Sequence, residues 1–321
     1  MRARTQAAVR AGIGAALTHG HSRAVGGILS AVTLIELSDG ALLDFRVSGP
    51  ENGAPFVMHH GTPGSLVAYR SIEQAVHRKG LRLVTYSRAG YGGSTRKPGR
   101  AVADIAQDLA ELLDHVGAER CVTLGWSGGG PHALATAALL PARVTGVTVV
   151  AGVGPYGQDD LDFMAGMGEG NIEEFGAALD GHDTLAPILE EAAASMRGAG
   201  IAEIVESMST LMPEVDRAAV KGEMGEDLAT HFAEAVRSGA AGWIDDDLAF
   251  VNPWGFDPAE ITVPAFLWQG DADLMVPFAH GRWLADRIPG AVAHLLAGEG
   301  HMSVFVNRVD EVLDELIATL G

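Results

Sequence analysis

The stretch that decides the fold is Cys121-Val122-Thr123-Leu124-Gly125-Trp126-Ser127-Gly128-Gly129. Its apolar first half predicts a buried strand, and an Ala/Leu-rich helical pattern follows over residues 132–140. A G-x-S-x-G motif between a strand and a helix is a tight turn, in which side chains two residues either side of the serine would collide with backbone. The turn strains the serine, and the following helix directs its N-terminus toward it. We therefore expect Ser127 to be a nucleophile.

Two windows far along the chain supply what a nucleophilic serine needs, a base and an acid that orients the base. Residues 269–277 follow a predicted strand and contain Asp271 and Asp273. Residues 298–303 follow the last predicted strand and contain His301. The chain order is therefore serine, aspartate, histidine, with each residue on a turn that leaves a strand.

Predicted strands and helices alternate along most of the chain. Apolar, β-branched runs predict strands at 33–37, 42–47, 56–59, 81–86, 121–124, 144–150, 265–268 and 291–296. Helical patterns lie at 65–79, 102–116, 128–140, 276–288 and 304–320. The first two strands are joined by the hairpin signal Ser38-Asp39-Gly40. This order predicts an α/β fold with a mostly parallel, doubly wound sheet.

The alternation stops between residues 155 and 257. Only helical patterns occur there, for example at 185–196 and 201–212. An insertion after the sixth core strand would cover the carboxyl ends of the strands, where open α/β sheets bind ligands. We therefore expect an N-terminal extension at 1–32, a core formed by 33–154 and 258–321, and a helical cap at 155–257.

The charge is concentrated in the predicted cap. The chain has a net charge of −19, and residues 156–257 hold 22 acidic against 4 basic residues. This balance argues against nucleic acid or an anionic membrane surface as a partner. Carboxylates at the mouth of a site could bind a cationic group, but solvated helix faces are the favoured interpretation. The first 31 residues contain four arginines and no acid. We interpret them as a helical or disordered extension, with a targeting segment as the alternative.

The remaining composition limits compartment and cofactors. One cysteine, Cys121, excludes an internal disulfide framework and suits a reducing compartment, so we expect a cytoplasmic protein. No apolar run is long enough for a membrane span. No residue cluster has zinc-ligand spacing, and Gly128-Gly129-Gly130 lacks the lysine of a phosphate-binding loop. We therefore expect no metal, no cofactor, a small-molecule substrate, and a monomer or homodimer.

The whole set of motifs resembles the α/β-hydrolase superfamily with a helical cap. From about Thr33 to the C-terminus the resemblance holds, most weakly in the cap, and the N-terminal half is similar to proline iminopeptidases and related esterases. It is carried by the motif around Ser127 and by four others: His60-Gly61-Thr62-Pro63-Gly64-Ser65, Ser87-Arg88-Ala89-Gly90-Tyr91-Gly92-Gly93-Ser94, Gly270-x-x-Asp273 and Gly300-His301.

The resemblance implies a role for each candidate residue. Ser127 would be the nucleophile, His301 the general base, and Asp273 the orienting acid, because it fits the family spacing. Asp271 is then a turn aspartate that bonds local backbone. Backbone N–H groups of Thr62 and Gly128 would form the oxyanion hole. The other polar residues of these motifs are expected to be structural: His60, Arg88, Tyr91 and Ser94 as loop supports, and His132 as a packing or surface residue.

The expected reaction is hydrolysis of a small carboxylic ester or lactone. The resembling peptidases have tryptophan after the nucleophile, whereas here Trp126 precedes Ser127 and Gly128 follows it. An aminopeptidase of the proline iminopeptidase type is the alternative. A ligand receptor of the same fold with residual hydrolysis is the third interpretation.

Overall fold

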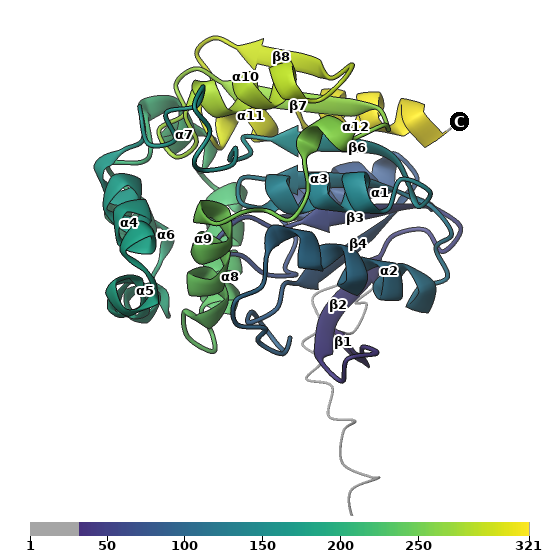
Figure 1. Cartoon of the computed structure of the whole chain (residues 1–321), viewed down its shortest axis with the longest axis horizontal. Coiled ribbons are helices and arrows are strands. Elements are labelled where there is room, and N and C mark those ends of the chain that lie inside the picture. The colour runs from purple at the N-terminus through teal and green to yellow at the C-terminus, as the bar shows by residue number, and fades with distance from the viewer. Residues whose placement is uncertain (1–31, 321) are drawn as a thin grey trace, which may run out of the picture.

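Eight strands form one sheet in the computed structural model, which describes residues 32–320 (Figure 1). The strand order is β1-β2-β4-β3-β5-β6-β7-β8, with β2 antiparallel to both neighbours and all other pairs parallel. The predicted mostly parallel α/β sheet is therefore confirmed. The extension predicted at 1–32 lies outside the described residues, apart from Val32. The strands are β1 Thr33–Glu36, β2 Leu42–Ser48, β3 Ala54–His59, β4 Leu81–Ser87, β5 Cys121–Trp126, β6 Val144–Val150, β7 Ala265–Gly270 and β8 Val292–Leu296.

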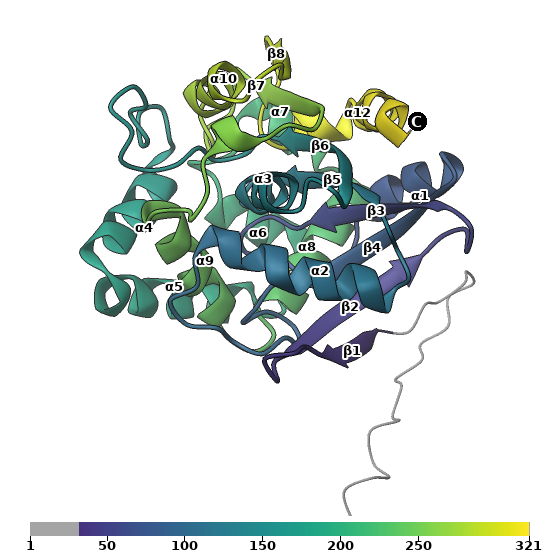
Figure 2. The same cartoon turned by 45° about the vertical axis from the view of Figure 1, so that its right-hand side comes forward.

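Helices cover both faces of the sheet (Figure 2). On one face, α2 (Ile105–His115), α3 (Gly129–Leu139) and α10 (Phe278–Arg287) bury apolar side chains in one cluster. On the other face, α1 (Arg70–Arg78) and α12 (Val309–Ile317) do so in a second cluster. The parallel strands are therefore buried on both sides, which explains why their sequences are apolar without alternation.

Three predicted helices differ in the structure, and the one over 102–116 begins with a 3-10 turn, η1 (Val102–Asp104), before α2. The helix predicted over 65–79 begins only at Arg70, because the Ser65 hydroxyl accepts the N–H of Val67 and the N–H of Leu66 binds Ser87. Such side-chain bonds compete with helix formation. The helix predicted over 304–320 is divided into α11 (Ser303–Val306), α12 and a short 3-10 turn, η3 (Ala318–Leu320).

The chain between β6 and β7 forms helices only, as far as the described residues show. We call residues 155–257 the cap, and Figure 1 shows its helices α4 to α6, α8 and α9 to the left of the sheet. Helix α7 lies apart from them, against α11 of the core. The cap helices are α4 Glu169–Asp180, α5 His182–Met196, α6 Ile201–Ser207, α7 Glu214–Ala219, α8 Glu223–Ala235 and α9 Ala241–Val251.

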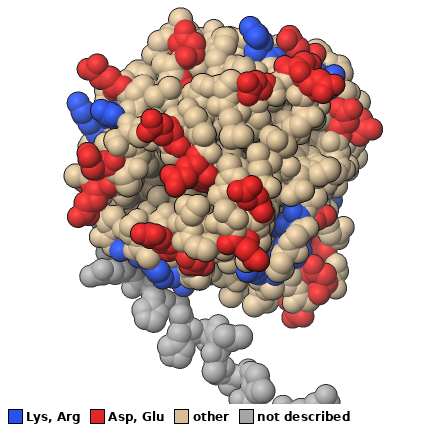
Figure 3. Space-filling view, turned by 60° about the vertical axis from the view of Figure 1, so that its left-hand side comes forward, with Lys and Arg blue, Asp and Glu red and all other residues tan. Residues whose placement is uncertain are grey.

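The acidic residues of the cap fall into two groups. Many are exposed, and the side of the molecule that carries the cap shows far more acidic than basic surface (Figure 3). Others are buried, which the interpretation as solvated helix faces did not expect: Asp216, Asp227, Asp245, Asp246 and Asp247. Buried carboxylates need partners, and these partners determine the geometry of the site described next. Across residues 32–320, the helices are too short or too polar to cross a membrane.

Candidate active site

Ser127 lies at the turn between β5 and α3 with a φ of 58°. This left-handed conformation is rare for a residue with a Cβ and stores strain. The turn requires glycine two residues on each side. A Cβ on Gly125 would lie 2.1 Å from the Gly129 carbonyl oxygen, and one on Gly129 would lie 2.2 Å from that of His59. The sequence motif therefore produces the expected sharp turn, which directs the serine hydroxyl into a cavity.

His301 and Asp273 meet at the carboxyl ends of the last two strands. The imidazole Nδ1 lies 2.9 Å from Asp273 Oδ2, and both side chains are buried. Asp273 Oδ1 accepts the backbone N–H groups of Met275 and Val276, each at 2.8 Å. Asp271 instead is exposed and accepts the N–H of Gly298 at 2.7 Å. Of the two aspartates in this turn, Asp273 is the one that orients the histidine.

The surroundings of His301 favour its protonated form. Burial opposes protonation, but the charge and hydrogen bond of Asp273, together with the charge of Asp216, raise the pKa of His301. The indole of Trp126 stacks on the imidazole with ring centroids 6.2 Å apart, and its N–H donates to the His301 carbonyl at 3.2 Å. The tryptophan that precedes the nucleophile therefore packs against the candidate base.

Asp216 holds the His301 loop from the cap. Its Oδ2 accepts the backbone N–H of His301 at 2.8 Å, and its Oδ1 accepts those of Met302 and Ser303, each at 2.9 Å. Gly300 approaches so closely that a Cβ would lie 2.5 Å from both carboxylate oxygens. Three backbone N–H groups thus donate to one buried carboxylate, which fixes the start of α11 and the backbone of the candidate base.

The loop after β3 brings Thr62 against the serine turn. A Cβ on Gly128 would lie 2.3 Å from Thr62 Oγ1, so the two segments are in direct contact. Within residues 32–320, the backbone N–H groups of Thr62 and Gly128 have no acceptor, and both residues line the same cavity as Ser127. Two free N–H donors beside a serine hydroxyl can bind an oxyanion.

A buried ion cluster supports this loop. The Arg88 guanidinium donates to the carbonyl of Gly61 at 2.8 Å and to Thr62 Oγ1 at 2.9 Å, and it also binds the carbonyl of His60. Its charge is balanced by Asp246 of α9, which also accepts the Thr62 hydroxyl at 2.8 Å. Burial alone would raise the pKa of Asp246, but the two arginines Arg88 and Arg100 hold it well below its ordinary value.

The other polar residues of the motifs lie in supporting positions. His60 Nδ1 contacts the Gly61 carbonyl at 2.7 Å, and its Nε2 accepts the backbone N–H of Arg88 at 3.1 Å. The Tyr91 hydroxyl donates to Asp246 at 2.8 Å, and the Ser94 hydroxyl to the Ser87 carbonyl at 2.6 Å. The last of these residues, His132, is buried beneath the Ser127 turn, and its Nδ1 lies 2.8 Å from the Gly128 carbonyl.

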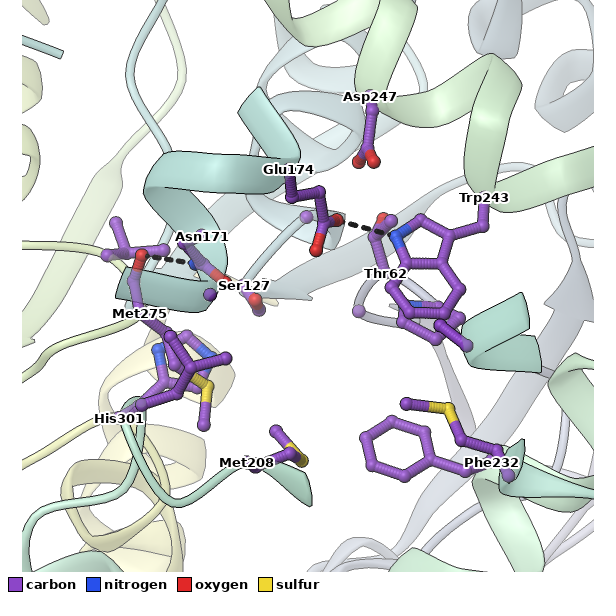
Figure 4. A pocket seen from close by; sticks show the side chains of 18 of the residues that line it. Thr62, Ser127, Asn171, Glu174, Met208, Phe232, Trp243, Asp247, Met275 and His301 are labelled. Atoms are coloured by element: carbon purple, nitrogen blue, oxygen red, sulfur yellow. Dashed lines mark hydrogen bonds between the residues drawn. The ribbon is translucent and has the colours of Figure 1, made fainter. Parts of the chain in front are cut away.

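These groups surround a cavity of about 280 Å³ between core and cap (Figure 4). Ser127 and His301 lie in its wall, and much of the remainder is apolar, including Met208, Phe232 and Met275. Within residues 32–320, no hydrogen bond joins the Ser127 hydroxyl to the His301 ring, whose Nδ1 faces Asp273. Such contacts often tighten only when substrate is bound. No group of three or more His, Cys, Asp or Glu side chains in residues 32–320 is arranged to hold a metal ion.

Sequence reasoning missed the cap residues of the site. Asp216 and Asp246 contact partners 85 and 158 positions away in the chain, so no local pattern reports them. One signal was present: Asp245-Asp246-Asp247 interrupts an apolar helix, and three acids in such a position call for partners. Glu174, Trp243 and Asp247 were likewise missed, and they line the cavity.

Comparison with known proteins agrees with this geometry. The α/β hydrolase fold family matches residues 54–308, and the chain belongs to that family. The uncharacterized hydrolase YcgS of Bacillus subtilis is 26% identical over 269 residues, covering 82% of this chain and 89% of the relative. The family match and this relative together place the chain among the hydrolases.

Two solved structures illustrate the shared fold. A thermophilic esterase from Thermogutta terrifontis superposes with a TM-score of 0.63 at 20% identity, covering 90% of this chain and 98% of the esterase. The enol-lactonase from Burkholderia xenovorans LB400 superposes with a TM-score of 0.62 at 21% identity, covering 90% and 99%. Both are similar to this chain in architecture.

Proposed function

We propose that this protein cleaves small carboxylic esters or lactones through an acyl-enzyme on Ser127. The observation that carries the proposal is one cavity lined by the strained serine, by two residues with free N–H donors and by His301, whose Nδ1 faces Asp273. Its volume of about 280 Å³ is near the lower end of the range of ~300–1,000 Å³ for ligand pockets, which favours a small substrate. The esterase and the enol-lactonase among the structural neighbours support the same reaction class.

The proposed mechanism begins with attack of Ser127 Oγ on the substrate carbonyl carbon. His301 accepts the hydroxyl proton on Nε2, because its Nδ1 faces Asp273, and the Asp273 carboxylate stabilises the resulting imidazolium. The N–H groups of Thr62 and Gly128 bind the oxyanion.

The tetrahedral intermediate then expels the alkoxide, which takes the proton from His301. Water attacks the acyl-enzyme in the second half of the reaction. His301 accepts a proton from that water and returns it to Ser127 Oγ as the carboxylic acid leaves.

Turnover of a short-chain aryl ester, a small lactone and a prolyl arylamide, measured side by side, tests the proposal. We expect ester and lactone cleavage, and a loss of about 10⁴-fold or more in kcat in Ser127→Ala, because the nucleophile is removed. Cleavage of the prolyl arylamide alone would establish the aminopeptidase instead. Ester cleavage that persists in Ser127→Ala would show that another group is the nucleophile.

A further inference from the structure

Two polar side chains, Tyr69 and His231, lie in the wall of the cavity and take no part in the proposed mechanism. Tyr69 is the residue before α1, and His231 belongs to α8 of the cap. Both are buried, with 5% and 4% of their surface exposed. Their rings stack with centroids 5.0 Å apart and an interplanar angle of 30°. The two rings therefore line neighbouring parts of the wall.

The contacts of His231 leave one ring nitrogen open. Nδ1 lies 2.8 Å from the carbonyl oxygen of Val67, and because a carbonyl only accepts, Nδ1 carries the ring proton. Nε2 of this tautomer is an acceptor, and it has no hydrogen-bond partner within residues 32–320. The atom retains accessible surface, and in a buried residue that lines the cavity this surface opens into the cavity. His231 thus presents a lone pair to a ligand.

The Tyr69 hydroxyl is open in the same way. It has no hydrogen-bond partner in the described part of the chain, and it retains accessible surface. Burial raises the pKa of this hydroxyl, so the group keeps its proton at neutral pH and can donate. The adjoining wall from α8 is apolar, with Leu228 and with Phe232, whose ring is visible in Figure 4. A donor and an acceptor are therefore set into an apolar surface.

Both rings are held in place by the core. The loop before α1 contacts α8 twice, since the Val67 carbonyl accepts from the ring of His231 and the Ser65 hydroxyl donates to the His231 carbonyl at 3.3 Å. The Tyr69 ring lies between His231 and the indole of Trp126, whose centroid is 5.3 Å away. The two polar atoms are thus positioned before a ligand binds, which lowers the entropy cost of binding.

We propose that Tyr69 and His231 form a subsite that binds a hydroxyl group of the substrate. A hydroxyl satisfies both atoms at once, because its O–H donates to His231 Nε2 and its oxygen accepts from the Tyr69 hydroxyl. The inference rests on the proposed function, because it names the substrate class of the same cavity: an ester or lactone that carries a free hydroxyl.

The surroundings disfavour the charged alternatives. An ammonium group has the donors, but burial lowers the pKa of His231 to about 4, and the Arg88 charge acts in the same direction. Surroundings that keep an imidazole neutral also oppose a ligand cation. A carboxylate would place its charge against the Nε2 lone pair, and no lysine or arginine is among the described residues that line the cavity. An uncharged hydroxyl fits best.

A row of aromatic rings sets the distance between this subsite and the reacting groups. His301, Trp126, Tyr69 and His231 follow one another, with successive ring centroids separated by 6.2, 5.3 and 5.0 Å. The subsite therefore lies beyond Trp126 as seen from the candidate base. We expect the effect of a substrate hydroxyl to depend on the number of carbons between it and the ester.

The activity test uses two series of esters at several matched chain lengths. In one series the acyl chain ends in a methyl or a hydroxyl group, and in the other the alcohol does. In one series and at one length, the wild-type protein should favour the hydroxyl ester by about tenfold in kcat/KM, as expected for two hydrogen bonds in a buried site.

Two variants remove the polar atoms and keep the packing. Tyr69→Phe lacks only the hydroxyl, so its melting temperature should equal that of the wild type. His231→Asn keeps an N–H donor for Val67 but lacks Nε2. Each should lower the preference to about threefold or less, and the double variant should favour the methyl ester, because an unpaired hydroxyl in an apolar wall is unfavourable.

The matched control is Tyr156→Phe. Tyr156 is 39% exposed and lies outside the cavity lining, so this variant should keep the hydroxyl preference within about twofold. Equal kcat/KM for methyl and hydroxyl esters at every length in both series would overturn the proposal. A hydroxyl preference that persists in the double variant would do the same.

A binding measurement separates this proposal from the proposed function. Titration calorimetry of Ser127→Ala with the matching carboxamides does not require turnover, and we expect about tenfold tighter binding of the carboxamide with the hydroxyl. If no ester is cleaved but this preference is seen, and Tyr69→Phe removes it, the proposed reaction fails and the subsite stands. If esters are cleaved and both carboxamides bind equally, the reaction stands and the subsite is refuted.

Discussion

The core and the cap each place an aspartate on His301, and the two act on different parts of it. Asp273 of the core accepts from the imidazole Nδ1 at 2.9 Å, whereas Asp216 of the cap accepts from the backbone N–H at 2.8 Å. The first contact fixes the tautomer of the ring and the second fixes the loop that carries it. In the proposed mechanism, therefore, the core provides the reacting groups and the cap positions them.

The same division holds on the other side of the cavity. Thr62 belongs to a core loop, but its hydroxyl and the supporting Arg88 both bind Asp246 of the cap. Both loops that surround Ser127 are therefore anchored on cap carboxylates. The cap is a structural part of the site as well as a cover for it.

The largest expected effect comes from the core aspartate. Asp273→Asn should lower kcat of the proposed hydrolysis by about 10⁴-fold, because an amide stabilises the wrong tautomer of His301. Steady-state kinetics with the aryl ester measures the loss.

Asp271→Asn is the matched control, since Asp271 is exposed in the same turn and contacts Gly298. Its kcat should stay within about twofold of wild type. A large loss in this variant, with a small loss in Asp273→Asn, would reverse the assignment of the orienting acid.

The next effect is on stability and comes from the cap. Asp246→Asn leaves Arg88 and Arg100 buried without their anionic partner, so the free energy of unfolding should fall by about 3–5 kcal/mol. Urea denaturation followed by circular dichroism measures it. The neighbouring Asp245→Asn breaks a pair with the partly exposed Arg96 and should cost about 1 kcal/mol or less. Equal losses in the two variants would contradict a special role of the buried cluster.

A smaller effect on rate is expected from Asp216→Asn. The amide keeps one acceptor oxygen but turns an NH₂ group toward backbone donors, so the His301 loop is held less well. We expect kcat to fall by about tenfold, as for the loss of one or two buried hydrogen bonds. Glu214→Gln removes an exposed charge from the same helix and should leave kcat unchanged.

The Asp216→Asn variant should also change the pH profile of kcat/KM. The base must be neutral to accept a proton, so kcat/KM rises with pH through the pKa of His301. Because the Asp216 charge contributes to raising that pKa, its removal should move the rising limb to lower pH. A lower kcat with an unmoved limb would mean that Asp216 acts on the loop through hydrogen bonds alone.

The fold was predictable because it depends on local patterns. Apolar runs gave the strands, and the glycines around Ser127 gave the turn, since both follow from short-range sterics and burial. The choice of Asp273 over Asp271 needed the spacing of a resembling family. The start of α1 at Arg70 depended on a side-chain bond of Ser65, which propensity does not report.

The cap half of the site was not predictable for a different reason. A buried acid and a solvated acid look alike in a sequence until the partner is known. Asp246 pairs with Arg88, 158 positions away, whereas Asp247, the next residue, lies against Glu174 of α4. Which of two adjacent aspartates meets an arginine depends on the tertiary packing of α9.

The hydrogen bonds between Asp216 and the His301 loop limit how this enzyme can be re-engineered. The cap is one inserted segment between β6 and β7, so it could be exchanged for the cap of a relative by joining the chain at two points. Here such a graft, or a minimal core made by deleting the cap, would remove the acceptor for three N–H groups at the base. A transplanted cap must therefore bring its own carboxylate to that position, or the core must be redesigned to close the loop without one.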